Sequence, residues 1–117
     1  MKNFNEMNEQ DIINTLKEIS KRYGVTYLRV GYSRERHNNT IMIVLNSDSD
    51  DNKTVRSIIN GIFLGLNDVE GNPLVNSPSY DDAICPSVCV YDSRFTEGIK
   101  LWIKHTERVG AITWLEV

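Results

Sequence analysis

Cysteines and long apolar runs are scarce in this sequence of 117 residues, and both absences restrict what the protein can be. Two cysteines are too few for the disulfide framework that stabilises small secreted domains. No apolar stretch approaches the roughly 18 residues that a membrane-spanning helix needs, and the first ten residues lack the apolar segment of a signal peptide. We therefore expect a cytoplasmic protein that makes no membrane contact.

The sequence also lacks an excess of basic residues. Its formal net charge is −3, whereas dedicated nucleic-acid-binding proteins usually present a strongly basic face. The charge is unevenly spread, because residues 48–92 contain eight acidic and only two basic side chains. This segment, with a net charge of −6, indicates a protein partner with a basic surface rather than direct contact with nucleic acid.

Glycine-rich phosphate loops and the serine motif of hydrolases are missing as well. None of the patterns G-x-G-x-x-G, G-x-x-x-x-G-K and G-x-S-x-G occurs in the chain. We therefore expect no nucleotide cofactor. The sequence favours a protein that is not an enzyme, without excluding catalysis.

The apolar fraction of 40% and the chain length fit one globular domain, residues 1–117, with an ordinary core. Asn8 and Asp11 are typical of a capping box at the start of a first helix, and Gly24 is typical of its end. Apolar spacing predicts the remaining elements. In order, we expect a helix at 9–22, strands at 25–32 and 40–46, a helix with apolar residues from Val55 to Leu66, a loop at 67–82, a strand at 83–91, a helix capped by Asp92 or Ser93, and a strand at 111–117.

The order α-β-β-α-β-α-β predicts an α+β fold. We expect a two-layer sandwich in which a mixed four-stranded sheet carries three amphipathic helices, mostly on one face. Alternation in strand 25–32 places Leu28, Val30 and Tyr32 on one face of the sheet. The opposite face would also be apolar, so we expect it to be a homodimer or partner interface unless the first helix covers it. Its expected residues are Val25, Tyr27, Met42 and Val44, or Cys85, Cys89 and Tyr91.

One acidic cluster precedes the second helix. Asp48, Asp50 and Asn52 match the first ligand positions of an EF-hand calcium loop. Lys53 and Ile59 stand where that loop requires glycine and glutamate, which excludes an EF-hand. Two alternatives stay open: a looser Mg²⁺ site, or simple capping of the helix, whose N-terminus favours negative charge.

A second acidic cluster ends the long loop, where Asp81 and Asp82 follow Tyr80. Paired carboxylates can serve acid–base or metal chemistry, and they can also form a solvated turn. Loops of this length are often functional. The acidic segment therefore predicts a partner-binding surface, which consists of Asp48, Asp50, Asp51, Glu70, Tyr80, Asp81 and Asp82.

The two cysteines do not predict a metal site. Cys85 and Cys89 are four residues apart, which on a strand separates them by about 13 Å. That distance is too long for a disulfide or a shared metal ion, so we interpret both as small buried apolar residues.

The only histidines, His37 and His105, are weak candidates for catalysis. A pair of histidines could cleave a phosphodiester, with Arg34 or Arg36 holding the phosphate. The simpler interpretation is that His105 complements the dipole at the end of the third helix.

Two functional classes follow from these patterns. The favoured one is a small binding or inhibitory module of the toxin-immunity or phage-inhibitor type, which acts by protein–protein contact. The alternative is a small enzyme acting on a phosphate-bearing substrate through His37, His105 or the acidic loops. A third hypothesis is a structural or chaperone subunit that works as a homo-oligomer.

Overall fold

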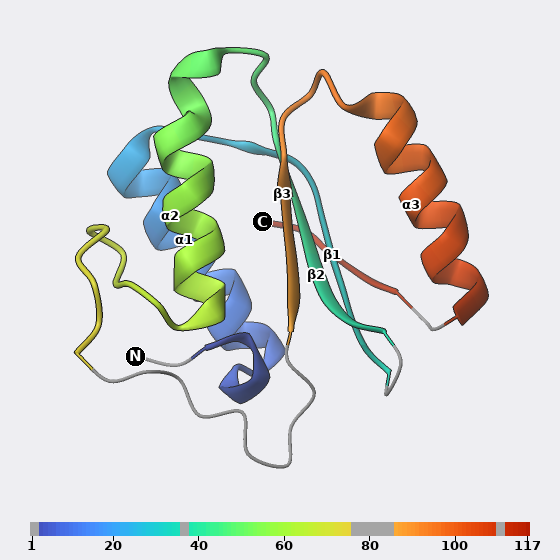
Figure 1. Ribbon diagram of the computed structural model, residues 1–117, viewed down its shortest axis with the longest axis horizontal. Coiled ribbons are helices and arrows are strands. Elements are labelled where there is room, and N and C mark those ends of the chain that lie inside the picture. Colours follow the sequence, from blue (N-terminus) through green and yellow to red (C-terminus); the bar gives the residue numbers. More distant parts are fainter. Residues whose placement is uncertain (1–2, 36–37, 76–85, 110–111) are drawn as a thin grey trace.

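The computed structural model describes residues 3–35, 38–75, 86–109 and 112–117 (Figure 1). Within these residues, three α-helices and four strands follow one another in the predicted order α-β-β-α-β-α-β, together with two short 3₁₀ helices. The elements are η1 (Phe4–Glu6), α1 (Glu9–Tyr23), β1 (Tyr27–Glu35), β2 (Asn38–Leu45), η2 (Asp50–Asn52), α2 (Lys53–Leu64), β3 (Ser87–Tyr91), α3 (Thr96–Val109) and β4 (Thr113–Leu115). No helix within these described segments is both long and apolar enough to cross a bilayer.

Helix α1 begins and ends as the sequence predicts. The Asn8 side chain accepts a hydrogen bond from the backbone N–H of Asp11 at 2.8 Å, and the Asp11 carboxylate accepts one from the N–H of Asn8 at 3.1 Å. This reciprocal capping box satisfies two N–H groups that the helix itself cannot pair. Gly24 ends the helix in the left-handed conformation, with φ of 67°.

The four strands form one mixed sheet in the order β3-β2-β1-β4. β1 pairs antiparallel with both β2 and β4, whereas β2 pairs parallel with β3. β1 and β2 therefore form a hairpin, and α2 forms the crossover between the parallel strands β2 and β3. Central strand β2 is buried from Thr40 to Leu45, as expected for a strand that packs on both faces.

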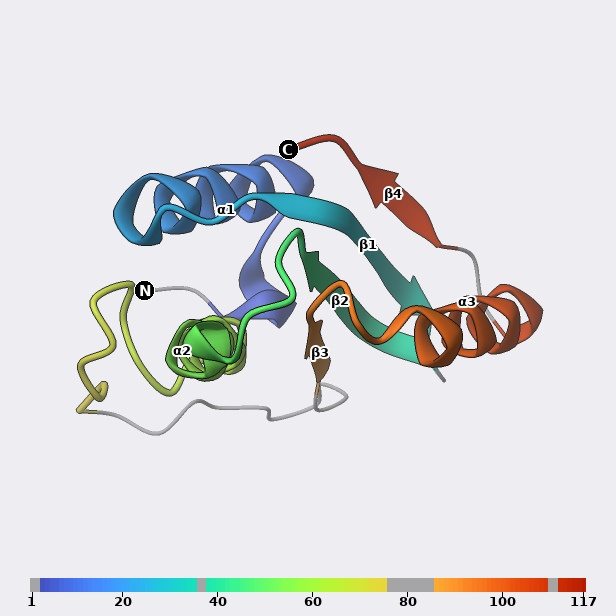
Figure 2. The same cartoon turned by 90° about the horizontal axis from the view of Figure 1, so that it is seen from above.

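Two helices cover one face of the sheet and the third covers part of the other (Figure 2). Ile41, Ile43 and Leu45 pack with α1 and α2, whereas Met42 and Val44 pack with α3. The sequence suggested α1 as the alternative cover for this second face, and that alternative is wrong. The connection through α2 runs from β2 to β3, and the connection through α3 runs back across the sheet from β3 to β4. Because the two connections run in opposite directions, both can have the usual right-handed crossover only if α2 and α3 lie on opposite faces.

A β-bulge in β1 changes which side chains share a face. Tyr27 lies opposite Leu45 and Arg29 lies opposite Val44, so Leu28 is an extra residue in the strand. The bulge therefore separates Leu28 from Val30, although the alternation in the sequence predicted both on the same face of the sheet. For the same reason Tyr27, like Val25, packs in the core under α1 and α2 instead of on the second face.

The third helix starts later than predicted. It begins at Thr96, and neither Asp92 nor Ser93 caps it. The Asp92 carboxylate instead accepts a hydrogen bond from the backbone N–H of Arg94 at 2.9 Å, and the N–H of Ser93 donates to the carbonyl of Ser47. Both contacts hold the β3–α3 connection in a turn, which delays the helix.

Candidate functional site

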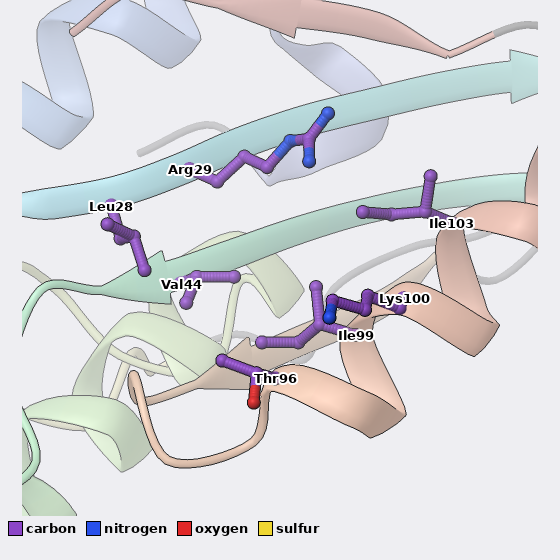
Figure 3. Close-up of a pocket in the computed structure, with 7 residues that line it drawn as sticks. All are labelled: Leu28, Arg29, Val44, Thr96, Ile99, Lys100 and Ile103. Carbon is purple, nitrogen blue, oxygen red and sulfur yellow. The ribbon is translucent and has the colours of Figure 1, made fainter.

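An open, mostly apolar groove of about 290 Å³ lies between the sheet and α3. Figure 3 shows that its lining side chains come from β1, β2 and α3. They are Leu28, Arg29, Val44, Thr96, Ile99, Lys100 and Ile103.

The groove exists because one helix is too narrow to cover four strands. Neighbouring strands lie about 4.8 Å apart, and helices pack about 8–10 Å from one another, so a single helix covers about two strands. Helix α3 packs on Met42 and Val44 of β2 and on Cys89 and Tyr91 of β3. The β1 side of this face is left open, and Leu28 remains 54% exposed there.

The charged groups at the groove are basic. Arg29 and Lys100 are the only charged residues that line it among those the structure describes. The Arg29 guanidinium lies 3.8 Å from the ring centre of Trp114 on β4, a cation–π contact that orients the side chain along the sheet. Lys100 lies 3.3 Å from Glu97 on the exposed side of α3. The groove therefore combines an apolar floor with two positive charges.

A second cluster of charged residues joins the end of β3 to the start of α2. Asp92 is buried, and its carboxylate accepts several hydrogen bonds from Arg94, the shortest at 2.6 Å. The Arg94 guanidinium also contacts Asp50 at 2.8 Å, and Arg56 of α2 lies 3.7 Å from Asp92. We call these four residues, Asp50, Arg56, Asp92 and Arg94, the ion-pair corner.

The ion-pair corner controls the ionisation of its own carboxylates. Hydrogen bonds from the Arg94 side chain hold the pKa of Asp92 below its usual value and outweigh the opposing effect of burial. The same guanidinium lowers the pKa of Asp50. Beside the corner, burial and the neighbouring Cys89 raise the pKa of Tyr91 to about 12, so its phenol stays neutral.

The predicted acidic partner surface is divided. Asp48, Asp50 and Asp51 lie at the start of α2, where Asp50 is paired with Arg94. Glu70 follows the other end of that 12-residue helix and lies 3.8 Å from Arg22. A helix of this length separates the two groups by roughly 18 Å. Three further predicted residues, Tyr80, Asp81 and Asp82, lie outside the described residues.

The predicted phosphate site lies only partly within the described residues. His105 is exposed near the end of α3, and His37 and Arg36 lie outside the described part of the chain. The Arg34 guanidinium donates to the carbonyls of Phe4 and Met7 and lies 4.3 Å from the Phe4 ring centre. Arg34 therefore fastens the N-terminal segment to β1, a structural role that the sequence did not suggest.

The structure describes one of the two cysteines that we interpreted as small buried apolar residues. Cys89 is half-buried and packs with Met42 under α3, and Cys85 lies outside the described residues. Across the described segments, no three His, Cys, Asp or Glu side chains gather closely enough to hold a metal ion.

Sequence reasoning missed the ion-pair corner and the position of the groove. Asp92 and Arg94 are close in sequence, and an aspartate directly after a strand was a usable signal for a turn. Their contacts with Asp50 and Arg56 depend on the parallel pairing of β2 and β3, which no local pattern reveals.

Comparison of the chain with protein-family models, with curated proteins and with solved structures gave no match. The groove and the ion-pair corner are therefore the features from which we infer a function.

Proposed function

We propose that this protein is a protein-binding module whose contact surface is the groove between α3 and the sheet. The observation that carries the proposal is the apolar surface at this groove, where Leu28 is 54% exposed beside Val44, Ile99 and Ile103. Apolar residues gathered around a groove are typical of interaction surfaces. Small inhibitory and immunity proteins act through such contacts alone, and we propose this class of activity.

The charges at the groove define the partner's chemistry. Arg29 and Lys100 favour a partner that inserts apolar side chains flanked by carboxylates. Asp48 and Asp51 are exposed on either side of Asp50. The ion pair between Asp50 and Arg94 holds this segment near the start of α3. These two carboxylates would meet basic residues at the edge of the same partner. Glu70 belongs to a different part of the surface, beyond the far end of α2.

A matched pair of leucines tests this proposal. Leu28 at the groove and Leu66 after α2 are 54% and 51% exposed, so aspartate at either position should change folding stability equally little. The tagged wild-type protein is used to capture its partner from cells, and the affinity of the purified partner is then measured by calorimetry. We expect Leu28→Asp to weaken binding at least tenfold, whereas Leu66→Asp leaves it within about twofold.

The remaining hypotheses give different results in the same experiment. Equal affinity of the two variants would contradict the groove as the contact surface. A stable dimer in sedimentation equilibrium that Leu28→Asp dissociates would instead support the homo-oligomer. Lys100→Glu should weaken the affinity for the partner. Recovery of that affinity when a carboxylate residue of the partner is changed to lysine would confirm the charge complementarity.

A further inference from the structure

A second pocket, separate from the groove, lies at the carboxyl end of β3. It has a volume of about 460 Å³ and shares none of the residues that line the groove. Its walls come from α2, from the last two residues of β3 and from the connection to α3. The lining residues are Arg56, Val90, Tyr91, Asp92, Arg94 and Phe95.

The two arginines of this pocket differ in how fully their donors are used. Arg94 donates to both oxygens of Asp92 and also contacts Asp50 at 2.8 Å, so two carboxylates share its guanidinium. Arg56 lies 3.7 Å from Asp92, and its Nε has no hydrogen-bond acceptor among the described residues. A buried donor without an acceptor is costly, and such groups in native proteins commonly mark a site where an ion or ligand binds. The Arg56 side chain is 26% exposed, and its contact with Asp92 is longer than a hydrogen bond, so Arg56 is the arginine of this pocket that can bind an anion.

The pocket also has an aromatic wall. The rings of Tyr91 and Phe95 are stacked, with centres 5.0 Å apart and planes inclined by 12°. Phe95 is 53% exposed, so one of its ring faces or edges remains available to a second flat molecule. The pocket thus places an aromatic surface and the Arg56 guanidinium, whose Nε has no hydrogen-bond partner among the described residues, within one space of about 460 Å³.

The position of the pocket in the fold supports a ligand independently of its side chains. β2 and β3 are parallel neighbours, and the helices that follow them lie on opposite faces of the sheet (Figure 2). In open sheets, the carboxyl ends of strands at such a reversal are where small ligands usually bind. The pocket opens at the end of β3, beside this point.

We propose that this pocket binds a small aromatic anion, with its phosphate or carboxylate group on Arg56 and its ring against Phe95. Two arginines line the pocket, and Arg94 is shared by Asp92 and Asp50, so Arg56 is the arginine that we assign to the anion. Asp92 does not repel the anion strongly, since Arg94 neutralises it directly.

Phenyl phosphate is a suitable probe, followed by ¹H–¹⁵N NMR of the full chain. We expect saturable shifts at Arg56 and at residues 91–95. The variant Arg56→Gln should weaken binding about tenfold through the lost charge-assisted hydrogen bonds. Arg22→Gln is the matched control, because it removes one positive charge from an arginine that is paired with Glu70 beyond the far end of α2. Equal weakening by both variants, or shifts centred on Arg29 and Lys100, would overturn the site.

Two further measurements keep the proposal testable if Arg56→Gln disturbs folding. Phe95→Leu changes an exposed ring and leaves every charge of the ion-pair corner in place. It should abolish the preference for phenyl phosphate over inorganic phosphate, which we expect to be at least fivefold in the wild type. Equal binding of the two probes by the wild-type protein would refute the aromatic part of the site. Benzoate, compared with phenyl phosphate, then identifies which anionic group the pocket prefers.

Discussion

The two faces of the sheet differ in how completely helices cover them. On one face α1 buries Ile12, Leu16 and Ile19, and α2 buries Ile59, Ile62 and Phe63. On the other face Ile99 is the one buried residue among the described side chains of α3, and it is still 7% exposed. Two helices match the width of four strands and one does not, so stability is concentrated on the first face and accessible apolar surface on the second.

A matched pair of isoleucines should show the largest difference between the faces. Ile62 on α2 is completely buried, whereas Ile103 on α3 is only half-buried beside the groove. We expect Ile62→Ala to lower the free energy of unfolding by about 3 kcal/mol, because it removes buried methyl groups and leaves a cavity. Ile103→Ala should lower it by less than about 1 kcal/mol. Urea unfolding measures both, and equal losses would show that α3 packs as tightly as α2.

The ion-pair corner, which connects the two faces, predicts a pH dependence. The pKa of Asp92 is lowered in the folded protein, chiefly by hydrogen bonds from Arg94. A carboxylate of this kind adds stability above its unfolded pKa of about 3.9, and that stability is lost as the pH falls through the lower folded pKa. Asp92→Asn should therefore lower the urea midpoint clearly at pH 7 and have little effect near pH 2.

The control for this prediction is Asp51→Asn. Asp51 is an exposed neighbour of the corner, so its variant should leave the midpoint almost unchanged at both pH values. A midpoint difference between wild type and Asp92→Asn that is the same at pH 7 and pH 2 would mean that the asparagine acts through packing and not through charge.

Local patterns predicted the elements well and their arrangement less well. The capping box at Asn8 and the apolar spacing of α2 are visible in the sequence because both depend on residues within a few positions. The bulge at Leu28 is not visible, since a single extra residue reverses the faces without changing the composition of the strand. The side on which α3 packs depends on strand order, which is set by contacts between distant residues.

The candidate sites were harder to predict for a related reason. Charge in the sequence pointed to Asp50 and Glu70 as one surface, but a helix separates them, and each lies near an arginine. The groove and the ion-pair corner arise where three elements meet. The groove is recognised by a half-covered sheet face, and the corner by an Arg56 Nε without an acceptor among the described residues. Both features exist only once α2 and α3 have packed on opposite faces.

Two helical glycines allow one more comparison of the two faces, and their substitution has the smallest expected effect on stability. A Cβ on Gly61 of α2 would lie 1.6 Å from the Asn67 side-chain oxygen, and Asn67 donates to the carbonyls of Ile58 and Asp68. A Cβ on Gly98 of α3 would lie 2.3 Å from the ring of Phe95, which is 53% exposed and stacked on Tyr91. Alanine is favoured over glycine in helices by up to about 1 kcal/mol, so this gain opposes the clash at both positions.

We therefore expect the two alanine variants to differ in melting temperature. Gly61→Ala should lower the melting temperature, because moving Asn67 breaks two hydrogen bonds at a cost of about 1–2 kcal/mol beyond the helical gain. Gly98→Ala should leave the melting temperature unchanged within a few degrees, because the Phe95 ring can yield into solvent. A large loss for Gly98→Ala would show that the stack of Phe95 on Tyr91 holds α3 against the sheet. The second face would then be stabilised at its edge, by the aromatic pair, rather than beneath the helix.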